Sequence, residues 1–232
     1  MKLRCIAAWG LGLLAVPVSA QETTALQTQK DKVSYLIGVQ VAETIKSQGI
    51  DIDPSLVATG LRDALSGAKL LMTDDDLRAT MTALQQEMAQ KQAQARSRAA
   101  DENKKAGETF LTENAKKEGV VTLASGLQYK VLKSAEGKKP TDAETVVCQY
   151  RGTLIDGTEF DSSYASGGPA TFQVSGLIPG IKEALQLMPV GATWQFFIPS
   201  DLAYGERGAG GAIGPNAMLI FEIELISIQD KP

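Results

Sequence analysis

The amino-acid sequence predicts an α+β protein, in which a helical first half precedes an antiparallel five-stranded sheet wrapped over one short helix. Two observations carry this expectation. Residues 21–118 contain few glycines, only Tyr35 and Phe110 are aromatic there, and the apolar residues recur at helical spacing. From Gly119 onward glycines, prolines and aromatic residues are concentrated, and apolar residues alternate along short segments as they do in strands.

The composition is that of a globular protein and excludes several classes of function. The 232 residues are 44% hydrophobic and 22% charged, with a net charge of −4. An acidic chain lacks the clustered Lys and Arg that bind phosphates, so no nucleic-acid partner is expected. The sequence has no histidine, which excludes Ser-His-Asp and Cys-His nucleophiles and any His-ligated metal. Neither a metal nor another cofactor is expected.

Residues 1–20 have the pattern of a secretory signal peptide. Lys2 and Arg4 precede an apolar run over Ile6–Val18, and the small residues Val18-Ser19-Ala20 form a cleavage sequence. The run is shorter than the ~20 residues that span a bilayer, so cleavage after Ala20 is favoured over a membrane anchor. We therefore expect secretion across the inner membrane, to the periplasm or the outer membrane, with no transmembrane segment in the mature chain.

Two short helices are expected in residues 21–72, which we interpret as a dimerisation region. Apolar residues at helical spacing predict the first helix over Asp31–Lys46, and the pair Asp53-Pro54 marks the start of the second. Helices this short do not bury their apolar faces alone. One interpretation is that residues 31–88 dimerise, with Gly38 and Gly60 allowing close helix contact. The other is that they pack against the second half of the chain.

Residues 73–118 are expected to form one long connecting helix. It begins at Thr73 with Asp74, Asp75 and Asp76 in its first turn, where carboxylates stabilise the positive end of the helix dipole. Its early apolar stripe gives way over residues 90–100 to alanines and polar helix formers, which have nothing large to bury. We interpret residues 90–100 as a solvated helical spacer.

Residues 119–232 are expected to form the sheet and its helix. The predicted strands are Ser125–Leu132, Thr145–Leu154 with a continuation over 158–161 after the turn at Asp156-Gly157, Ala170–Val174, Trp194–Pro199 and Ala217–Ile228, and the predicted helix is Pro179–Met188. Cys148, the only cysteine left after cleavage, lies in the second strand with no base beside it. We interpret it as a small core hydrophobe rather than a reactive thiol.

Six motifs follow one another in this second half. They are Tyr150-Arg151-Gly152, Asp156–Ser163, Ile178-Pro179-Gly180, Glu183-Ala184-Leu185, Ala203-Tyr204-Gly205 and Leu219–Leu225. As an ordered set they resemble the FKBP-type peptidyl-prolyl cis-trans isomerases. The leader, helical front half and long spacer resemble the macrophage infectivity potentiator (Mip) subgroup of secreted bacterial members. The resemblance implies an FKBP-like fold for residues 119–232 and an isomerase that assists the folding of exported proteins.

The same resemblance implies partners and a site. The partners are proline-containing unfolded chains or peptides, a second copy bound through the N-terminal helices, and macrolide inhibitors such as tacrolimus and rapamycin. The expected catalytic residues are Asp161, Tyr204 and Tyr150, and the expected substrate-binding residues are Phe160, Leu177, Ile178, Ile181, Ile213, Phe221 and Phe172. Ile181 stands where the family usually has tryptophan, so the pocket floor loses a flat aromatic surface. Residues 164–168 contain no arginine, so we expect the Tyr150 hydroxyl to hold Asp161.

Such a pocket isomerises proline without histidine, metal or nucleotide. Rotation about an X-Pro bond faces a barrier of ~18–20 kcal/mol, because amide resonance resists twisting. The twisted amide has less charge separation than the planar one, so an apolar site stabilises it preferentially and lowers the barrier. The alternative function is a dimeric chaperone that clamps unfolded chains between its arms, with weak or no isomerase activity. The Ile181 floor and the long spacer motivate that alternative.

Overall fold

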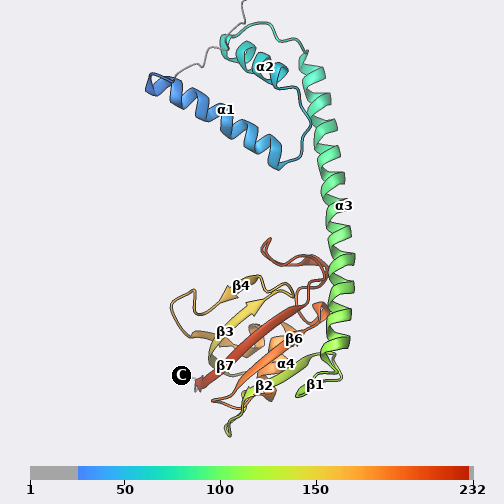
Figure 1. Cartoon of the computed structure of the whole chain (residues 1–232), viewed down its shortest axis with the longest axis vertical. Coiled ribbons are helices and arrows are strands. Elements are labelled where there is room, and N and C mark those ends of the chain that lie inside the picture. The colour runs from blue at the N-terminus through green and yellow to red at the C-terminus, as the bar shows by residue number, and fades with distance from the viewer. Residues whose placement is uncertain (1–25, 230–232) are drawn as a thin grey trace, which may run out of the picture. The chain divides into compact units, whose positions relative to one another are not determined.

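The computed structural model describes residues 26–229, so the expected leader over residues 1–20 lies outside the described residues. The chain divides into two compact units at the boundary between Thr73 and Asp74. Figure 1 shows helices α1 and α2 before this boundary, and the long helix α3 and the sheet after it. Over residues 26–229, no helix has a stretch that is both long enough and apolar enough to cross a bilayer.

The described residues of the first unit form two helices whose starts are fixed by local capping, α1 (Gln29–Ser47) and α2 (Pro54–Ser66). Thr28 and Asp31 form a capping box in which each side chain accepts the backbone N–H of the other, at 3.1 and 2.8 Å. Asp53 accepts the N–H of Ser55 at 2.7 Å, which confirms the predicted start of α2. No described residue of α1 or α2 is buried, and Leu36 and Leu65 are among their exposed apolar side chains.

The second unit begins with α3 (Asp74–Asn114), which ends close to the predicted position. Residues 90–98 are exposed, as expected for a solvated spacer, but residues 99 and 100 are half-buried and Arg96 donates hydrogen bonds to a loop of the C-terminal domain. Further along α3, Gly107 is buried against Met218, and the ring centroids of Phe110 and Phe197 are 5.7 Å apart. The last part of α3 is therefore packed on the domain that follows it.

The described residues form one antiparallel sheet of seven strands, where five were predicted. The strands are β1 (Val120–Thr122), β2 (Gln128–Lys133), β3 (Thr145–Thr153), β4 (Glu159–Ser162), β5 (Ala170–Gln173), β6 (Thr193–Ile198) and β7 (Leu219–Gln229). Their order is β1-β2-β6-β7-β3-β4, with β5 also paired to β3. The strand β1 was missed because three residues are too few to show alternation. The predicted continuation of the second strand is β4, which turns back and pairs with β3.

The helix α4 (Pro179–Leu187) lies against the inner face of the sheet and completes the core. Its Ala184 and Leu185 are buried together with Leu225 of β7. A Cβ at Gly180 would lie 2.4 Å from Cγ2 of Ile198, so glycine allows the start of α4 to approach β6. Three short 3-10 helices connect the larger elements: η1 (Val174–Gly176), η2 (Ser200–Leu202) and η3 (Gly205–Arg207).

Candidate active site

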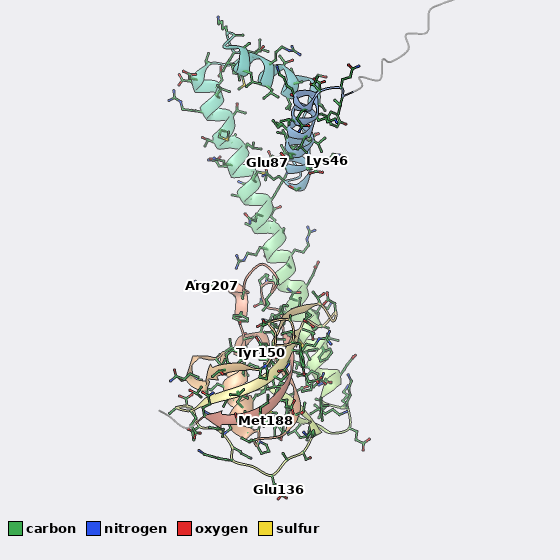
Figure 2. All side chains as sticks on the ribbon, turned by 90° about the vertical axis from the view of Figure 1, so that its left-hand side faces the viewer. Lys46, Glu87, Glu136, Tyr150, Met188 and Arg207 are labelled. Atoms are coloured by element: carbon green, nitrogen blue, oxygen red, sulfur yellow. The ribbon has the colours of Figure 1, made fainter. Side chains whose placement is uncertain are left out.

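An apolar cavity of about 320 Å³ opens between α4 and the inner face of β3 and β7. Its lining is Cys148, Tyr150, Asp161, Phe172, Gly176, Leu177, Ile178, Ile181, Leu185, Tyr204, Phe221 and Ile223. Figure 2 shows Tyr150 within the strands of the domain that forms this cavity. The volume is at the lower end of the ~300–1,000 Å³ typical of small-ligand pockets, so it suits one ring or side chain rather than a large cofactor.

Most of the sequence-predicted site residues are brought together in this lining, and two are not. The predicted residues that line the cavity are Tyr150, Asp161, Phe172, Leu177, Ile178, Ile181, Tyr204 and Phe221. Phe160 is outside the lining and packs edge-on against Phe221, with ring centroids 5.5 Å apart. Ile213 is 8% exposed and is buried in the loop that precedes β7. Phe160 thus supports the cavity wall through its contact with Phe221, and Ile213 belongs to the buried core.

Four further residues, which were not predicted as site residues, line the cavity: Cys148, Gly176, Leu185 and Ile223. The alternation of apolar residues places a side chain on the inner face of a strand or helix. It does not say whether that side chain meets packed atoms or empty space. Core and cavity residues therefore carry the same sequence signal, and only the assembled fold separates them.

Gly152 allows the aromatic wall to close. The strand register pairs Gly152 with Phe221 on β7 and with Asp161 on β4. A Cβ at Gly152 would lie 2.7 Å from Cζ of Phe160 and 2.9 Å from Cε1 of Phe221, closer than real Cβ contacts. Glycine is thus required at this strand position so that both rings can lie over the backbone.

Tyr150 and Asp161 form the polar rim of the cavity. The Tyr150 hydroxyl donates a hydrogen bond to Oδ2 of Asp161 at 2.9 Å, which confirms the expected contact. Burial, followed by the hydrogen bond and the charge of Asp161, raises the pKa of Tyr150 to about 12. The phenol therefore stays protonated at neutral pH and holds the carboxylate at the mouth of an apolar hollow.

Cys148 lies at the back of the cavity and is only 2% exposed. Burial raises the pKa of its thiol to about 12, because the thiolate would lose hydration that no nearby group replaces. The neutral thiol is a poor nucleophile. Cys148 therefore adds apolar surface, in agreement with its interpretation as a small hydrophobe.

Two hydrogen-bond donors remain available at the rim. The backbone N–H of Ile178, the residue before α4, has no acceptor in the part of the chain that the structure describes. Tyr204 is 40% exposed, and its hydroxyl likewise donates to no group among residues 26–229. The site thus combines an apolar interior with donors suited to backbone carbonyls. Such an arrangement is chemically suited to an apolar ring flanked by peptide groups.

Two family models match the chain. The domain amino terminal to FKBP-type peptidyl-prolyl isomerase matches residues 30–131, and FKBP-type peptidyl-prolyl cis-trans isomerase matches residues 136–226. The second match contains every residue of the cavity lining.

Curated relatives match nearly the whole chain. The outer membrane protein MIP of Legionella longbeachae is 47% identical over 230 residues, which cover 99% of this chain and 99% of that protein. The peptidyl-prolyl cis-trans isomerase Mip of Coxiella burnetii is 42% identical, covering 95% of this chain and 96% of that protein. The crystal structure of FkpA from Escherichia coli superposes with a TM-score of 0.74 at 32% identity, covering 90% of this chain and 100% of that one.

Proposed function

The chain belongs to the FKBP-type peptidyl-prolyl cis-trans isomerases, close to the Mip proteins, and we propose that the cavity beside α4 is where it isomerises X-Pro bonds. The protein is an isomerase, and its substrates are peptides containing proline. The observation that supports this location is that the cavity has an apolar interior and a polar rim formed by Tyr150 and Asp161.

We propose that the cavity lowers the rotational barrier by removing water from the amide. Rotation about X-Pro breaks no bond to carbon and has a barrier of ~18–20 kcal/mol. The planar amide is the more polar state and is better hydrated, so its transfer into an apolar cavity costs more than transfer of the twisted amide. Catalysis is then the preferential stabilisation of the twisted amide.

Each part of the lining has a role in this mechanism. Ile181 and Phe221 hold the pyrrolidine ring. The N–H of Ile178 donates to a substrate carbonyl, and the Tyr204 hydroxyl donates to the substrate backbone. Asp161, fixed by Tyr150, faces the reacting carbonyl region at the mouth. Binding on both sides of the ring keeps one half of the peptide in place while the other half rotates.

The test is the cis-to-trans relaxation of an X-Pro tetrapeptide with residues 21–232. Wild type should accelerate relaxation strongly, and Asp161→Leu and Tyr204→Ala should lower kcat/KM. Tyr164→Ala is the matched control, because Tyr164 is a 62% exposed tyrosine outside the cavity lining. A wild-type rate equal to buffer rejects the proposed function. Equal losses in all three variants reject the proposed site.

We propose macrolides such as tacrolimus and rapamycin as ligands of the same cavity. A macrolide that presents an apolar ring beside a carbonyl matches the interior and the Ile178 donor. Competitive inhibition of the tetrapeptide reaction, weakened by Tyr204→Ala, is the expected result. Inhibition unaffected by substitutions in the lining would place the macrolide elsewhere.

We propose that residues 21–72 form a homodimer, that residues 73–118 connect it to the catalytic domain, and that residues 119–232 act as the isomerase domain. Exposed apolar side chains on α1 and α2, among them Leu36 and Leu61, support the dimer. Sedimentation equilibrium of residues 21–232 should give a dimer, and Leu36→Asp should give a monomer. A monomeric wild type at micromolar concentration contradicts this assembly.

We propose that the leader directs the protein to the periplasm or the outer membrane. The support is the sequence pattern ending at Ala20, and the name of the Legionella relative is consistent with it. Sequencing of the mature N-terminus should find Gln21 after cell fractionation places the protein in the envelope. An intact Met1 in the cytoplasm would contradict the proposal.

The chaperone alternative has one observation in its favour, the exposed apolar surface of α1 and α2. It predicts that the Asp161→Leu variant still suppresses aggregation of an unfolded protein. Loss of suppression with loss of isomerase activity would remove this alternative.

A further inference from the structure

The loop that carries Tyr204 and Ile213 is folded into one closed unit, residues 204–216, here called the Tyr204 loop. Ala209 and Ile213 exchange two backbone hydrogen bonds of 2.9 and 3.0 Å. Gly208 has φ +62°, and a Cβ there would lie 2.3 Å from the carbonyl oxygen of Ile213, so this turn requires glycine. The N–H of Asn216 closes the loop by donating to the oxygen of Gly205 at 2.8 Å.

One end of the Tyr204 loop is held by Arg96 of α3. Nη2 of Arg96 donates to the carbonyl oxygen of Arg207 at 2.8 Å and to that of Glu206 at 3.3 Å. These carbonyls stand at the end of η3, where a cationic donor is favourable. Both views place this loop beside α3, and Figure 2 labels Arg207 on it.

The other end of the loop is held by Asn103 of α3. Its Nδ2 donates to the oxygen of Pro215 at 2.9 Å and lies 2.9 Å from where a Cβ of residue 214 would be, so Gly214 lets the amide approach. Nδ2 of Asn216 contacts the oxygen of Ala100 at 3.5 Å. The α3 residues involved are separated by four and three positions, so they lie on one face of the helix.

We propose that Arg96 and Asn103 are positioning residues for isomerisation, through which α3 holds the Tyr204 loop at the cavity. This inference rests on the proposed role of Tyr204. The Tyr204 hydroxyl has no hydrogen-bond partner among the described residues, and the side chain is 40% exposed. Its position is therefore set by the backbone of the loop, and that backbone is anchored to α3 at both ends. The connecting helix belongs functionally to the active site.

The anchors can be removed without opening the core. Arg96 is exposed, and its hydrogen bonds go to loop carbonyls at the surface. Arg98, two residues along α3, is also exposed and makes no hydrogen bond or ion pair within residues 26–229. Arg98→Ala thus changes charge and helix propensity in the same way as Arg96→Ala, but it keeps the hydrogen bonds from Arg96 to the loop.

The experiment measures kcat/KM for the tetrapeptide with residues 21–232 as wild type, Arg96→Ala, Asn103→Ala and Arg98→Ala. In Arg96→Ala and in Asn103→Ala, kcat/KM should fall about fivefold, which is the factor that corresponds to the loss of one surface hydrogen bond. The kcat/KM of Arg98→Ala should equal that of wild type. Thermal unfolding reports whether the fold survives. When the same anchor substitutions are made in Tyr204→Phe, kcat/KM should fall by less than about twofold. The reason is that the anchors act by positioning the Tyr204 hydroxyl, which this variant lacks.

Equal activity of Arg96→Ala and Arg98→Ala would overturn the inference, as would the same loss with and without the Tyr204 hydroxyl. Amide hydrogen exchange over residues 204–216 gives a second readout that needs no activity. Exchange should be faster in Arg96→Ala than in Arg98→Ala, and equal rates would overturn the inference. An inactive wild type rejects the proposed function, and hydrogen exchange then still decides whether α3 anchors the loop.

Discussion

Tyr150 connects the apolar interior of the cavity to its charged rim, and this position gives it a pH signature. Its pKa is raised from 10.0 to about 12 by burial and by Asp161. A folded-state pKa above the unfolded value means that the neutral phenol is favoured in the fold. The stabilisation is therefore complete below pH 10 and is lost as pH rises through 12.

We expect the free energy of unfolding of wild type to fall as pH rises above 10, because Tyr150 ionises. In Tyr150→Phe this part of the fall should be absent. Urea unfolding of wild type and variant at several pH values between 8 and 12 measures it. The burial-raised pKa of Cys148, about 12 against 9.0, causes a separate loss that starts near pH 9 and should persist in the variant. Identical stability–pH curves for the two proteins would contradict the Tyr150 assignment.

Ile181 gives a second residue-scale prediction. Ile181 is 7% exposed and lines the cavity together with Cys148 and Leu185. A larger ring at position 181 would therefore extend into the apolar cavity. Ile181→Trp should raise kcat/KM for the tetrapeptide about two- to tenfold, the range given by an aromatic contact. Ile181→Leu should give no gain. A folded Ile181→Trp protein with lower activity would show that residue 181 is not beneath the proline ring.

The sequence motifs predicted correctly that most of the named residues lie together at one cavity, and they failed for two residues whose position depends on packing. Tyr150, Asp161 and Phe221 were correctly placed together. Phe160 was expected in the lining, but the space over Gly152 lets its ring turn onto Phe221. Ile213 was expected there too, and its loop folds back on itself instead. Side-chain volume and loop closure decide these outcomes, and neither is local in sequence.

Among the elements, β3, β4 and β7 meet at Gly152 in a tightly packed part of the cavity wall. Gly152→Ala should destabilise the domain by about 1–3 kcal/mol, because the added methyl overlaps two aromatic rings. It should also lower kcat/KM by displacing Phe221. Urea unfolding tests the first effect, with Gly176→Ala as control because a Cβ there meets nothing within 4 Å. Equal stability of both variants would contradict the packing argument.

Helix starts were predictable because their causes are local. The side chain of Asp53 caps the backbone two residues away. The docking of α3 was not predictable, since the partners of Arg96 and Asn103 are more than a hundred residues away in sequence. An alanine-rich, polar stretch indicates a helix but does not show what its polar side chains will contact. Helix starts could therefore be predicted because the capping residue is near in sequence, and the docking of α3 could not because its partners are distant in sequence.

At the scale of the whole molecule, Gly38 and Gly60 distinguish a dimer from independent helices. A Cβ at either position meets nothing within 4 Å in the single chain, so alanine should stabilise an isolated helix by up to about 1 kcal/mol. If the glycines allow close helix contact across a dimer, the double variant Gly38→Ala/Gly60→Ala should instead weaken association. Sedimentation equilibrium decides, and tighter or unchanged association would contradict packing through these glycines.

In the proposed mechanism, the proline ring of the substrate enters the cavity beside α4. The most direct measurement is the set of nuclear Overhauser contacts between a proline-containing peptide and the protein. The pyrrolidine protons should contact the Ile178 and Ile181 methyl groups and the Phe221 ring, and none should reach Tyr164. Ring contacts confined to residues outside the cavity, with the lining unperturbed, would show that the proline ring binds elsewhere.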